Sequence, residues 1–315
     1  MAYYVVTGGA GFIGSHLADG LFRRGHRVRV VDDLSTGRRN NLDARIELQV
    51  GDVADRDVMR AALRGADGVF HLAAIASVAR ANEDWLGTHR VNQSGTIAVL
   101  EAARDAGRIP VVYASSAAVY GDQGDVRLHE ALPPAPLSAY GADKLGSELH
   151  ARVAFRVHGT PTMGLRFFNV YGPRQDPRSP YSGVISIFAE RIAHRRMVTI
   201  NGDGQQTRDF VFVDDVVEHL LAGMDRLLRR PEASVYNVCT GRSTSIVGLA
   251  ETLGEISGWS PTMSFAPERA GDIRTSLGSP TAARLALRVG AGAGLAEGLA
   301  VLLASTVAPP MRMAI

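Results

Sequence analysis

The stretch TGGAGFIGS, residues 7–15, joins a β-branched run at residues 3–7 to a segment with apolar residues at helical spacing that ends at Gly25. Gly8, Gly11 and Gly14 allow a tight turn and a close approach of the backbone to a pyrophosphate, and Phe12 and Ile13 lie between them. The first turn of the following helix offers free N–H groups and the positive end of its dipole. This strand–turn–helix pattern predicts a dinucleotide-binding site.

A carboxylate at the end of the second apolar run supports this interpretation. Asp32, followed by Asp33, ends the run RVRVVDD at residues 27–33, where an acidic side chain accepts hydrogen bonds from the ribose hydroxyls. It would repel a 2′-phosphate, so the pattern favours NAD over NADP. Arg38 and Arg39 are the only argument for NADP. Asp52, followed by Val53, ends the third run and is placed to meet the adenine.

The first half of the chain alternates between short apolar runs and helical patterns. Strands are predicted at residues 3–9, 27–33, 45–52, 68–74, 109–116 and 162–170, and helices at 55–64, 88–106 and 140–158. Such alternation implies right-handed crossovers and a parallel sheet covered by helices on both faces. The predicted fold class is therefore α/β, with a doubly wound parallel Rossmann sheet.

The pattern changes after Tyr171. The segment GPRQDPRSPYSG, residues 172–183, is rich in Pro, Gly and Ser and predicts a loop. We therefore expect an NAD-binding domain at residues 1–170 and a smaller mixed α/β substrate-binding cap at residues 171–315. One apolar run near residues 234–240 is expected to return to the main sheet.

Two groups of polar residues are candidates for the chemistry. Tyr140 and Lys144 stand four residues apart, which places them on one helix face a turn apart. A nearby ammonium and a positive nicotinamide would lower the pKa of the phenol and suit it to proton transfer. Ser115 and Ser116 end the fifth predicted strand, at the sheet edge where ligands bind.

Composition narrows the class of protein. The 315 residues carry a formal charge of only +2, with no block of like charges, so we expect no nucleic-acid or membrane partner. The single cysteine, Cys239, forms no intrachain disulfide and is expected to be a small core residue. The N-terminus has no signal-peptide pattern. These features together predict a cytoplasmic protein.

A family resemblance rests on several stretches taken together. They are TGGAGFIGSHL, VDDLSTG, HLAA, SSAAVYG, YGADK, LRFFNVYGPRQDP, SPYSGVISIF, GDGQQTRDFVFVDD and APERAGDI, running from Tyr3 to Asp272. The chain resembles the extended short-chain dehydrogenase/reductase family, and within it most closely the UDP-glucose/UDP-N-acetylglucosamine 4-epimerases. The resemblance implies NAD as cofactor, a UDP-sugar as substrate, no metal, and a homodimer formed through residues 88–106 and 140–158.

The resemblance also assigns roles to residues. Tyr140 would be the acid/base, Lys144 would hold the ribose and tune the phenol, and Ser116 would bond the sugar hydroxyl. The cofactor would be lined by Gly8, Gly11, Phe12, Ile13, Gly14, Asp32, Asp33, Asp52, Val53, Leu72, Ala73, Ala74, Asn92 and Ser115, besides Tyr140 and Lys144. The substrate would meet Ser77, Asn169, Val184, Arg208, Arg269 and Asp272, besides Ser116.

Three other activities are weighed against 4-epimerisation. The 4,6-dehydratases of the family carry an Asp–Glu pair after the active-site hydroxyl, where this chain has Ala117 and Ala118. Uronate 4-epimerases and decarboxylases are less favoured, because uronate epimerases tend to have Thr at the position of Asn169. Non-catalytic NAD-binding relatives lose the Tyr or the Lys. The small Ser276, near the sugar's C2, leads us to expect that N-acetylated sugars are admitted.

The C-terminal segment departs from the family pattern. Residues 288–315 are rich in Ala and Gly and lack the usual aromatic-rich final helix. The outer wall of the pocket is therefore where this chain is expected to differ from its relatives.

Overall fold

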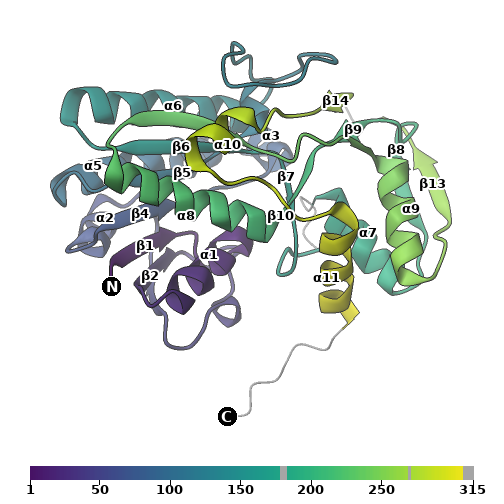
Figure 1. Cartoon of the computed structure of the whole chain (residues 1–315), viewed down its shortest axis with the longest axis horizontal. Coiled ribbons are helices and arrows are strands. Elements are labelled where there is room, and N and C mark those ends of the chain that lie inside the picture. Colours follow the sequence, from purple (N-terminus) through teal and green to yellow (C-terminus); the bar gives the residue numbers. More distant parts are fainter. Residues whose placement is uncertain (178–182, 269–270, 308–315) are drawn as a thin grey trace.

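The computed structural model describes residues 1–177, 183–268 and 271–307 (Figure 1). Its centre is a parallel sheet of seven strands in the order β11-β6-β5-β4-β1-β2-β3. The strands are β1 (Tyr3–Thr7), β2 (Arg27–Asp32), β3 (Glu47–Val50), β4 (Gly68–His71), β5 (Val111–Ser116), β6 (Thr162–Phe167) and β11 (Ala233–Val238). The predicted α/β class with a doubly wound parallel sheet is confirmed.

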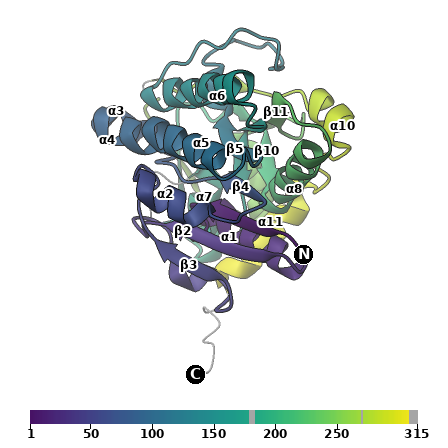
Figure 2. The ribbon, with the colours of Figure 1, turned by 90° about the vertical axis from the view of Figure 1, so that its left-hand side faces the viewer.

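Helices cover both faces of this sheet (Figure 2). One face carries α1 (Phe12–Arg23), α8 (Val213–Arg229) and α10 (Thr281–Leu287), and the other carries α2 (Arg56–Leu63), α5 (Gly95–Asp105) and α6 (Ala139–His158). Successive strand residues point to opposite faces. Val6 therefore packs with the α1 and α8 side, while its neighbour Val5 packs with the α2 and α5 side.

The segment before α5 is more elaborate than the single helix expected at residues 88–106. The structure has α3 (Val78–Glu83), α4 (Trp85–His89) and a π-helical turn, η2 (Arg90–Ser94), that runs into α5. A π turn inserts one extra residue into the helix and is frequent at functional sites.

The sixth predicted strand, residues 162–170, is too long. It ends at Phe167, and Asn169 begins β7 (Asn169–Tyr171), which pairs instead with β10 (Phe210–Phe212) in a separate sheet. Phe168 is buried between the two strands and Val170 and Tyr171 continue the apolar run, so hydrophobicity alone could not show the break.

The remaining elements form a second hydrophobic cluster beside the sheet (Figure 1). Its elements are α7 (Val184–Ala193), β8 (Val198–Asn201), α9 (Ile246–Ser257), β13 (Met263–Ala266) and α11 (Leu295–Val307). A separate sheet of three short strands has the order β12 (Thr244–Ser245), β9 (Thr207–Arg208) and β14 (Thr275–Ser276). The strand β11 lies beside β6 in the main sheet.

None of the helices within the described ranges is long and apolar enough to cross a membrane. The Ala-rich α11 packs on α7 and α9, and the Tyr171 hydroxyl donates to the Leu295 carbonyl. Small residues permit this approach, since a Cβ built on Gly298 would lie 2.3 Å from the Tyr171 hydroxyl oxygen. The final helix therefore closes the second cluster without aromatic side chains.

Candidate active site

The glycine-rich turn leaves no room for larger residues. Gly8 has φ +67°, and a Cβ added there would lie 2.6 Å from the Ala73 backbone nitrogen. A Cβ on Gly14 would lie 2.2 Å from the Gly8 carbonyl oxygen. The helix α1 begins after Gly11 with no side chain capping its first turn. The turn therefore presents free N–H groups at a helix N-terminus, an arrangement that suits a pyrophosphate.

Asp32 is fixed beside this turn at the end of β2. Its carboxylate accepts hydrogen bonds from the backbone N–H groups of Ala10, at 3.0 Å, and Leu34, at 2.9 Å. Burial raises the pKa of this carboxyl, and the two N–H groups oppose that rise. Of the two arginines that argued for NADP, Arg38 is paired with Asp176, and Arg39 donates to backbone carbonyls.

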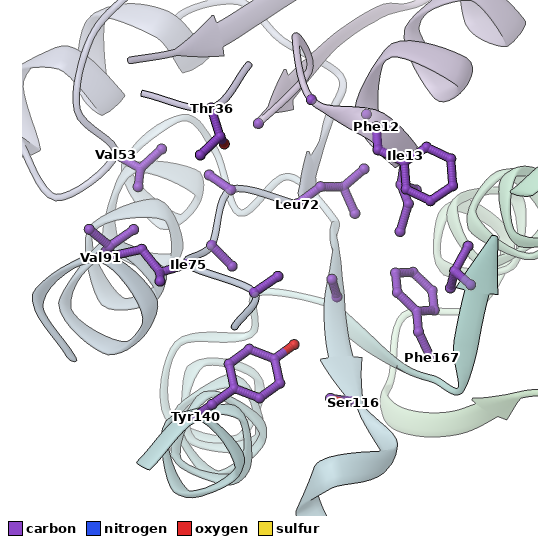
Figure 3. Close-up of a pocket in the computed structure, with 18 of the residues that line it drawn as sticks. Phe12, Ile13, Thr36, Val53, Leu72, Ile75, Val91, Ser116, Tyr140 and Phe167 are labelled. Carbon is purple, nitrogen blue, oxygen red and sulfur yellow. The ribbon is translucent and has the colours of Figure 1, made fainter. Parts of the chain in front are cut away.

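A cavity of about 560 Å³ runs from this turn to the carboxyl ends of β4, β5 and β6 (Figure 3). Most of the residues assigned to the site from the sequence line it. They are Gly8, Gly11, Phe12, Ile13, Gly14, Asp32, Asp33, Asp52, Val53, Leu72, Ala73, Ala74, Ser115, Ser116, Tyr140, Lys144 and Asn169. The fold therefore gathers residues from both ends of the first 170 positions into one cleft.

Tyr140 and Lys144 enter the cavity from the first two turns of α6. Ser138 caps this helix by accepting a hydrogen bond from the Gly141 N–H. In Figure 3 the Tyr140 hydroxyl points into the cavity, with Ser116 at the end of β5 nearby. The Lys144 ammonium donates to the Ala114 carbonyl at 2.9 Å, and its nitrogen lies 5.8 Å from the centre of the Tyr140 ring.

Burial dominates the protonation of this pair. It raises the pKa of Tyr140, and a hydrogen bond from Ser116 opposes that rise. Burial also lowers the pKa of Lys144 to about 8, against the charge of Asp143. The net shift of the phenol pKa in the protein alone is therefore upward, whereas the expected lowering was for Lys144 acting together with a positive nicotinamide.

Five assigned residues lie off the cavity within the described part of the chain; they are Ser77, Asn92, Val184, Arg208 and Asp272. Ser77 caps α3 by accepting from the Arg80 N–H. The Asn92 amide is buried and bonds both the N–H and the carbonyl of Ile75. Both therefore shape the wall of the cavity from behind.

The other three belong to the second part of the chain. Arg208 on β9 forms an ion pair with Asp272, although the resemblance assigned them to different parts of the substrate. Val184 is the first residue of α7, next to Gly183, which does line the cavity. Arg269 lies outside the described residues.

The cavity also has walls that the sequence did not indicate. They include Ser35, Thr36, Gly51, Ile75, Ala76, Arg80, Val91, Ala114, Phe167, Phe168, Val170, Gln175 and Gly183. Phe167 ends β6 at the same sheet edge as Ser115, so the rule that found the serine applies to it as well. Arg80 and Val91 stand on helices whose contacts with the cavity depend on tertiary packing.

These observations fit a nicotinamide dinucleotide. The turn formed by Gly8, Gly11 and Gly14, called here the glycine cradle, has no space for a Cβ at Gly8 or Gly14. The carboxylate of Asp32 lies at the end of β2. Tyr140, Lys144 and Ser116 lie where the cleft passes the ends of β5 and α6. A redox cofactor in this cleft would place its reactive end beside a phenol, an ammonium and a hydroxyl.

Comparisons with known proteins agree with this geometry. The sequence profile described as the NAD dependent epimerase/dehydratase family matches residues 4–239. The chain is 38% identical over 309 residues to a UDP-glucose 4-epimerase of Mycolicibacterium smegmatis, covering 94% of this chain and 96% of that one.

Solved structures are similar over nearly the whole chain. A UDP-glucose 4-epimerase with UDP-glucose from Thermotoga maritima superposes with a TM-score of 0.92 at 36% identity, covering 96% of this chain and 98% of that one. A UDP-N-acetylglucosamine 4-epimerase from Methanobrevibacter ruminantium, in complex with UDP-N-acetylmuramic acid, gives 0.91 at 32% identity, with 96% and 97% covered. The chain therefore belongs to the NAD dependent epimerase/dehydratase family.

Proposed function

We propose that this protein is an NAD-dependent epimerase that inverts C4 of a UDP-hexose, either the glucose/galactose pair or its N-acetylated counterpart, through a transient 4-keto sugar. The carrying observation is the grouping of Ser116, Tyr140 and Lys144 at the mouth of a dinucleotide cleft, with Ala117 and Ala118 following the serine. Proton transfer at one sugar oxygen is the chemistry that this set supports.

The three residues are proposed to have the roles that the family resemblance implies, and their positions support this. Tyr140 is the acid/base that takes the proton of the sugar 4-hydroxyl and returns it, and Ser116 bonds the same oxygen. Lys144 holds the cofactor ribose and, as a cation, favours the phenolate once the cofactor is bound. Bound NAD would supply reversible hydride exchange with C4 of the sugar.

The cofactor is proposed to lie along the cleft. Its pyrophosphate would meet the N–H groups after Gly11, its adenosine ribose would meet Asp32, and Asp52 with Val53 would face the adenine. In the residues that the structure describes, the carboxylates lining the cavity are Asp32, Asp33 and Asp52, all from the β2 and β3 end.

The substrate is proposed to lie between the cleft and the second part of the chain. Asn169 and Ser77 would be on its sugar side, and Val184 would line its nucleotide side. Arg208 and Arg269 would face the diphosphate, and Asp272 would hold the nucleotide ribose. Ser276 on β14 pairs in register with Arg208 on β9. The small side chain of Ser276 supports admission of an N-acetyl group.

The runner-up activities fit this site less well. Elimination of water by a 4,6-dehydratase needs a carboxyl acid or base, and Ala117 and Ala118 stand in the two positions that follow Ser116. A uronate epimerase or decarboxylase would use the same three residues, but uronate epimerases tend to have Thr at the position of Asn169. A non-catalytic NAD-binding protein has no need of the phenol and ammonium that face this cavity.

The organisation of the whole protein is part of the proposal. Residues 1–170 would bind NAD and residues 171–315 would bind the sugar nucleotide, with β11 contributed to the first part. Leu149, Val153 and Val157 recur every four residues along α6 with their side chains exposed, as Trp85 and Leu86 of the adjoining α4 also are. This apolar surface supports a homodimer, which we place in the cytoplasm as part of the proposal.

An NMR time course tests the proposal. UDP-glucose, UDP-N-acetylglucosamine and UDP-glucuronate are offered separately to the NAD-loaded protein. Appearance of the C4 epimer of either of the first two, with no 4-keto-6-deoxy product, is expected. Conversion of UDP-glucuronate alone would move the assignment to the uronate enzymes, and no conversion of any of the three would favour the binding protein.

A further inference from the structure

His71, at the end of β4, is buried behind the cofactor-lining loop of residues 72–75 and has no role in the mechanism above. Leu72, Ala73, Ala74 and Ile75 all line the cavity. Ala73 also lies against the glycine turn, since a Cβ on Gly8 would contact its backbone nitrogen. Any displacement of this loop would change the shape of the dinucleotide cleft.

A continuous chain of hydrogen bonds passes through the histidine ring. The Ala73 N–H donates to the Thr7 hydroxyl oxygen at 3.3 Å, and that hydroxyl lies 2.8 Å from His71 Nδ1. On the other side of the ring, His71 Nε2 lies 3.1 Å from the Thr96 hydroxyl oxygen. The Thr96 hydroxyl in turn donates to the Asn92 carbonyl at 2.6 Å.

The chain closes on the same loop. The Asn92 side chain accepts from the Ile75 N–H at 2.8 Å and donates to the Ile75 carbonyl at 3.2 Å. The loop is therefore held at Ala73 from one side and at Ile75 from the other, and His71 is the central link between the two. Both anchor residues of the far side, Asn92 and Thr96, flank the junction of the π turn η2 and α5.

The proton count along this chain fixes the state of the imidazole. A carbonyl oxygen only accepts, so the one proton of the Thr96 hydroxyl lies on the bond to Asn92, while the Ser147 hydroxyl, 3.2 Å from Thr96 Oγ1, donates to the Asp143 carbonyl. The proton between Thr96 and the ring must then come from His71 Nε2. Burial, aided by the charge of Lys144, lowers the pKa of His71 to about 3, so the ring carries no second proton near neutrality. Nδ1 is therefore an acceptor, and Thr7 donates to it.

We propose that His71 is a positioning residue for the dinucleotide site, acting as a neutral imidazole with its proton on Nε2 to hold the loop of residues 72–75 against the glycine turn. In the other tautomer the Nδ1–H would donate to the Thr7 hydroxyl oxygen, and Nε2 could only accept from Thr96, whose one proton is held by the Asn92 carbonyl. The bond between the ring and Thr96 would then be lost, and with it the link between Ala73 and Ile75.

The tautomer is tested by long-range ¹H–¹⁵N NMR on protein labelled at histidine, with the His71 signals assigned from a His71→Phe sample. One protonated Nε2 and one unprotonated Nδ1 are expected, unchanged between about pH 8 and pH 5. An Nδ1-protonated ring, or a shift to the charged form within that range, would overturn the proposal.

The positioning role is tested by calorimetric titration of the folded, NAD-free protein with NAD. His71→Phe is expected to weaken NAD binding by about tenfold or more, since it breaks both ring bonds while filling the volume. His219→Phe is the matched control, because His219 is also buried with a lowered pKa and its Nδ1 bonds only the Asp215 carbonyl in the described structure. It is expected to cost stability while leaving NAD affinity within about twofold.

A second pair of variants covers the case in which His71→Phe does not fold. Thr96→Val removes the hydroxyl link at nearly constant volume, and Thr96→Ser retains it. We expect weaker NAD binding in the first and near-normal binding in the second. Equal NAD affinity in Thr96→Val and wild type would show that the chain does not position the site. Since NAD binding is read directly, these outcomes do not depend on which sugar is turned over.

Discussion

Tyr140 and Lys144 are set by one helix, so their separation is independent of the loops around them. The Ser138 cap fixes where α6 begins, and the bond from Lys144 to the Ala114 carbonyl fixes the helix against β5. In the protein alone the phenol has a raised pKa, so it waits in the protonated form. Arrival of a positive nicotinamide is therefore the event that we expect to favour proton release.

Replacement of Tyr140 by Phe tests this assignment. We expect turnover of the UDP-sugar to fall by about 10²–10⁴, the usual contribution of a positioned acid/base, with NAD binding retained. The measurement is the NMR time course, with NAD affinity by calorimetry. Tyr4→Phe is the matched control, because Tyr4 is a buried phenol at the other end of the sheet, packed against Phe70. Wild-type turnover by Tyr140→Phe would refute the mechanism.

Gly14→Ala tests the glycine cradle. The added methyl would meet the Gly8 carbonyl oxygen at 2.2 Å, and backbone cannot yield as a side chain can. We expect a loss of about 1–3 kcal/mol in the free energy of unfolding and a clear weakening of NAD binding. Gly292→Ala serves as control, since nothing lies within 4 Å of a Cβ there. Equal NAD affinity in the two variants would contradict the proposed cradle.

At the scale of elements, α6 carries a third functional position one turn beyond Lys144. The buried carboxylate of Glu148 accepts hydrogen bonds from Nε and Nη2 of Arg166 on β6, at 2.8 and 2.7 Å. It also accepts one from the Ser115 hydroxyl on β5, at 2.5 Å. The Arg166 guanidinium also lies over the Tyr120 ring, 4.7 Å from its centre. One helix is thereby bonded to the two strands whose ends form the inner wall of the cavity.

Removing one charge of the Glu148–Arg166 pair should lower the free energy of unfolding more than replacing both charges. Glu148→Ala leaves a buried guanidinium without its counterion, and we expect a loss of about 3–5 kcal/mol in urea unfolding. The double variant Glu148→Met with Arg166→Met replaces both charges with apolar side chains and should recover most of that loss. A double variant that is less stable than Glu148→Ala would show that the pair stabilises the fold by more than mutual compensation.

The strands of the main sheet and the glycine turn could be predicted because they depend on local patterns. A β-branched run predicts a strand, and a glycine-rich segment after it predicts a turn, without knowledge of the rest of the chain. The break at Phe168 could not be predicted, since it depends on β7 pairing with β10 instead of joining the main sheet. The ion pair between Arg208 and Asp272 could not be predicted either, because these residues come together only when β9 and β14 pair.

The cavity divides in the same way. Residues at strand ends, such as Asp32 and Ser116, follow from the rule that ligands bind at the carboxyl edge of a parallel sheet. Asn92 was expected to support the cofactor, and its contact is indirect, since it bonds Ile75 from behind the loop that lines the cavity. Helical residues such as Arg80 and Val91 depend on how α3 and the π turn pack, which no local pattern states.

At the scale of the whole molecule, the exposed apolar stripe on α6 leads to a prediction about assembly. Val153→Glu with Val157→Glu would place charges on the proposed dimer surface, and we expect a monomer in sedimentation at concentrations where wild type is dimeric. Val126→Glu, on the exposed loop before α6, is the control and should stay dimeric. A dimer that survives the double change would place the interface elsewhere.

The buried histidines predict how stability depends on pH. His71 has a folded pKa of about 3 against an ordinary value of 6.5, so between those values the unfolded chain binds a proton that the folded chain refuses. The free energy of unfolding should therefore fall as the pH drops below 6.5, by up to about 1.4 kcal/mol per pH unit from this group alone. Burial lowers the pKa of His16 and His219 as well, which adds to the slope in the same direction.

Comparison with His71→Phe isolates the contribution of this one ring. Asp32 and Asp209 have raised pKa values and act in the opposite direction, but they are common to both proteins and cancel in the difference. The free energy of unfolding, measured in urea at about pH 7.5, 6.5 and 5.5, should therefore change less steeply with pH in the variant. The difference in slope is expected to be up to about 1.4 kcal/mol per pH unit, the value for one proton. Identical slopes would mean that His71 becomes charged in the folded protein, which neither its burial nor a single Nε2 proton would allow.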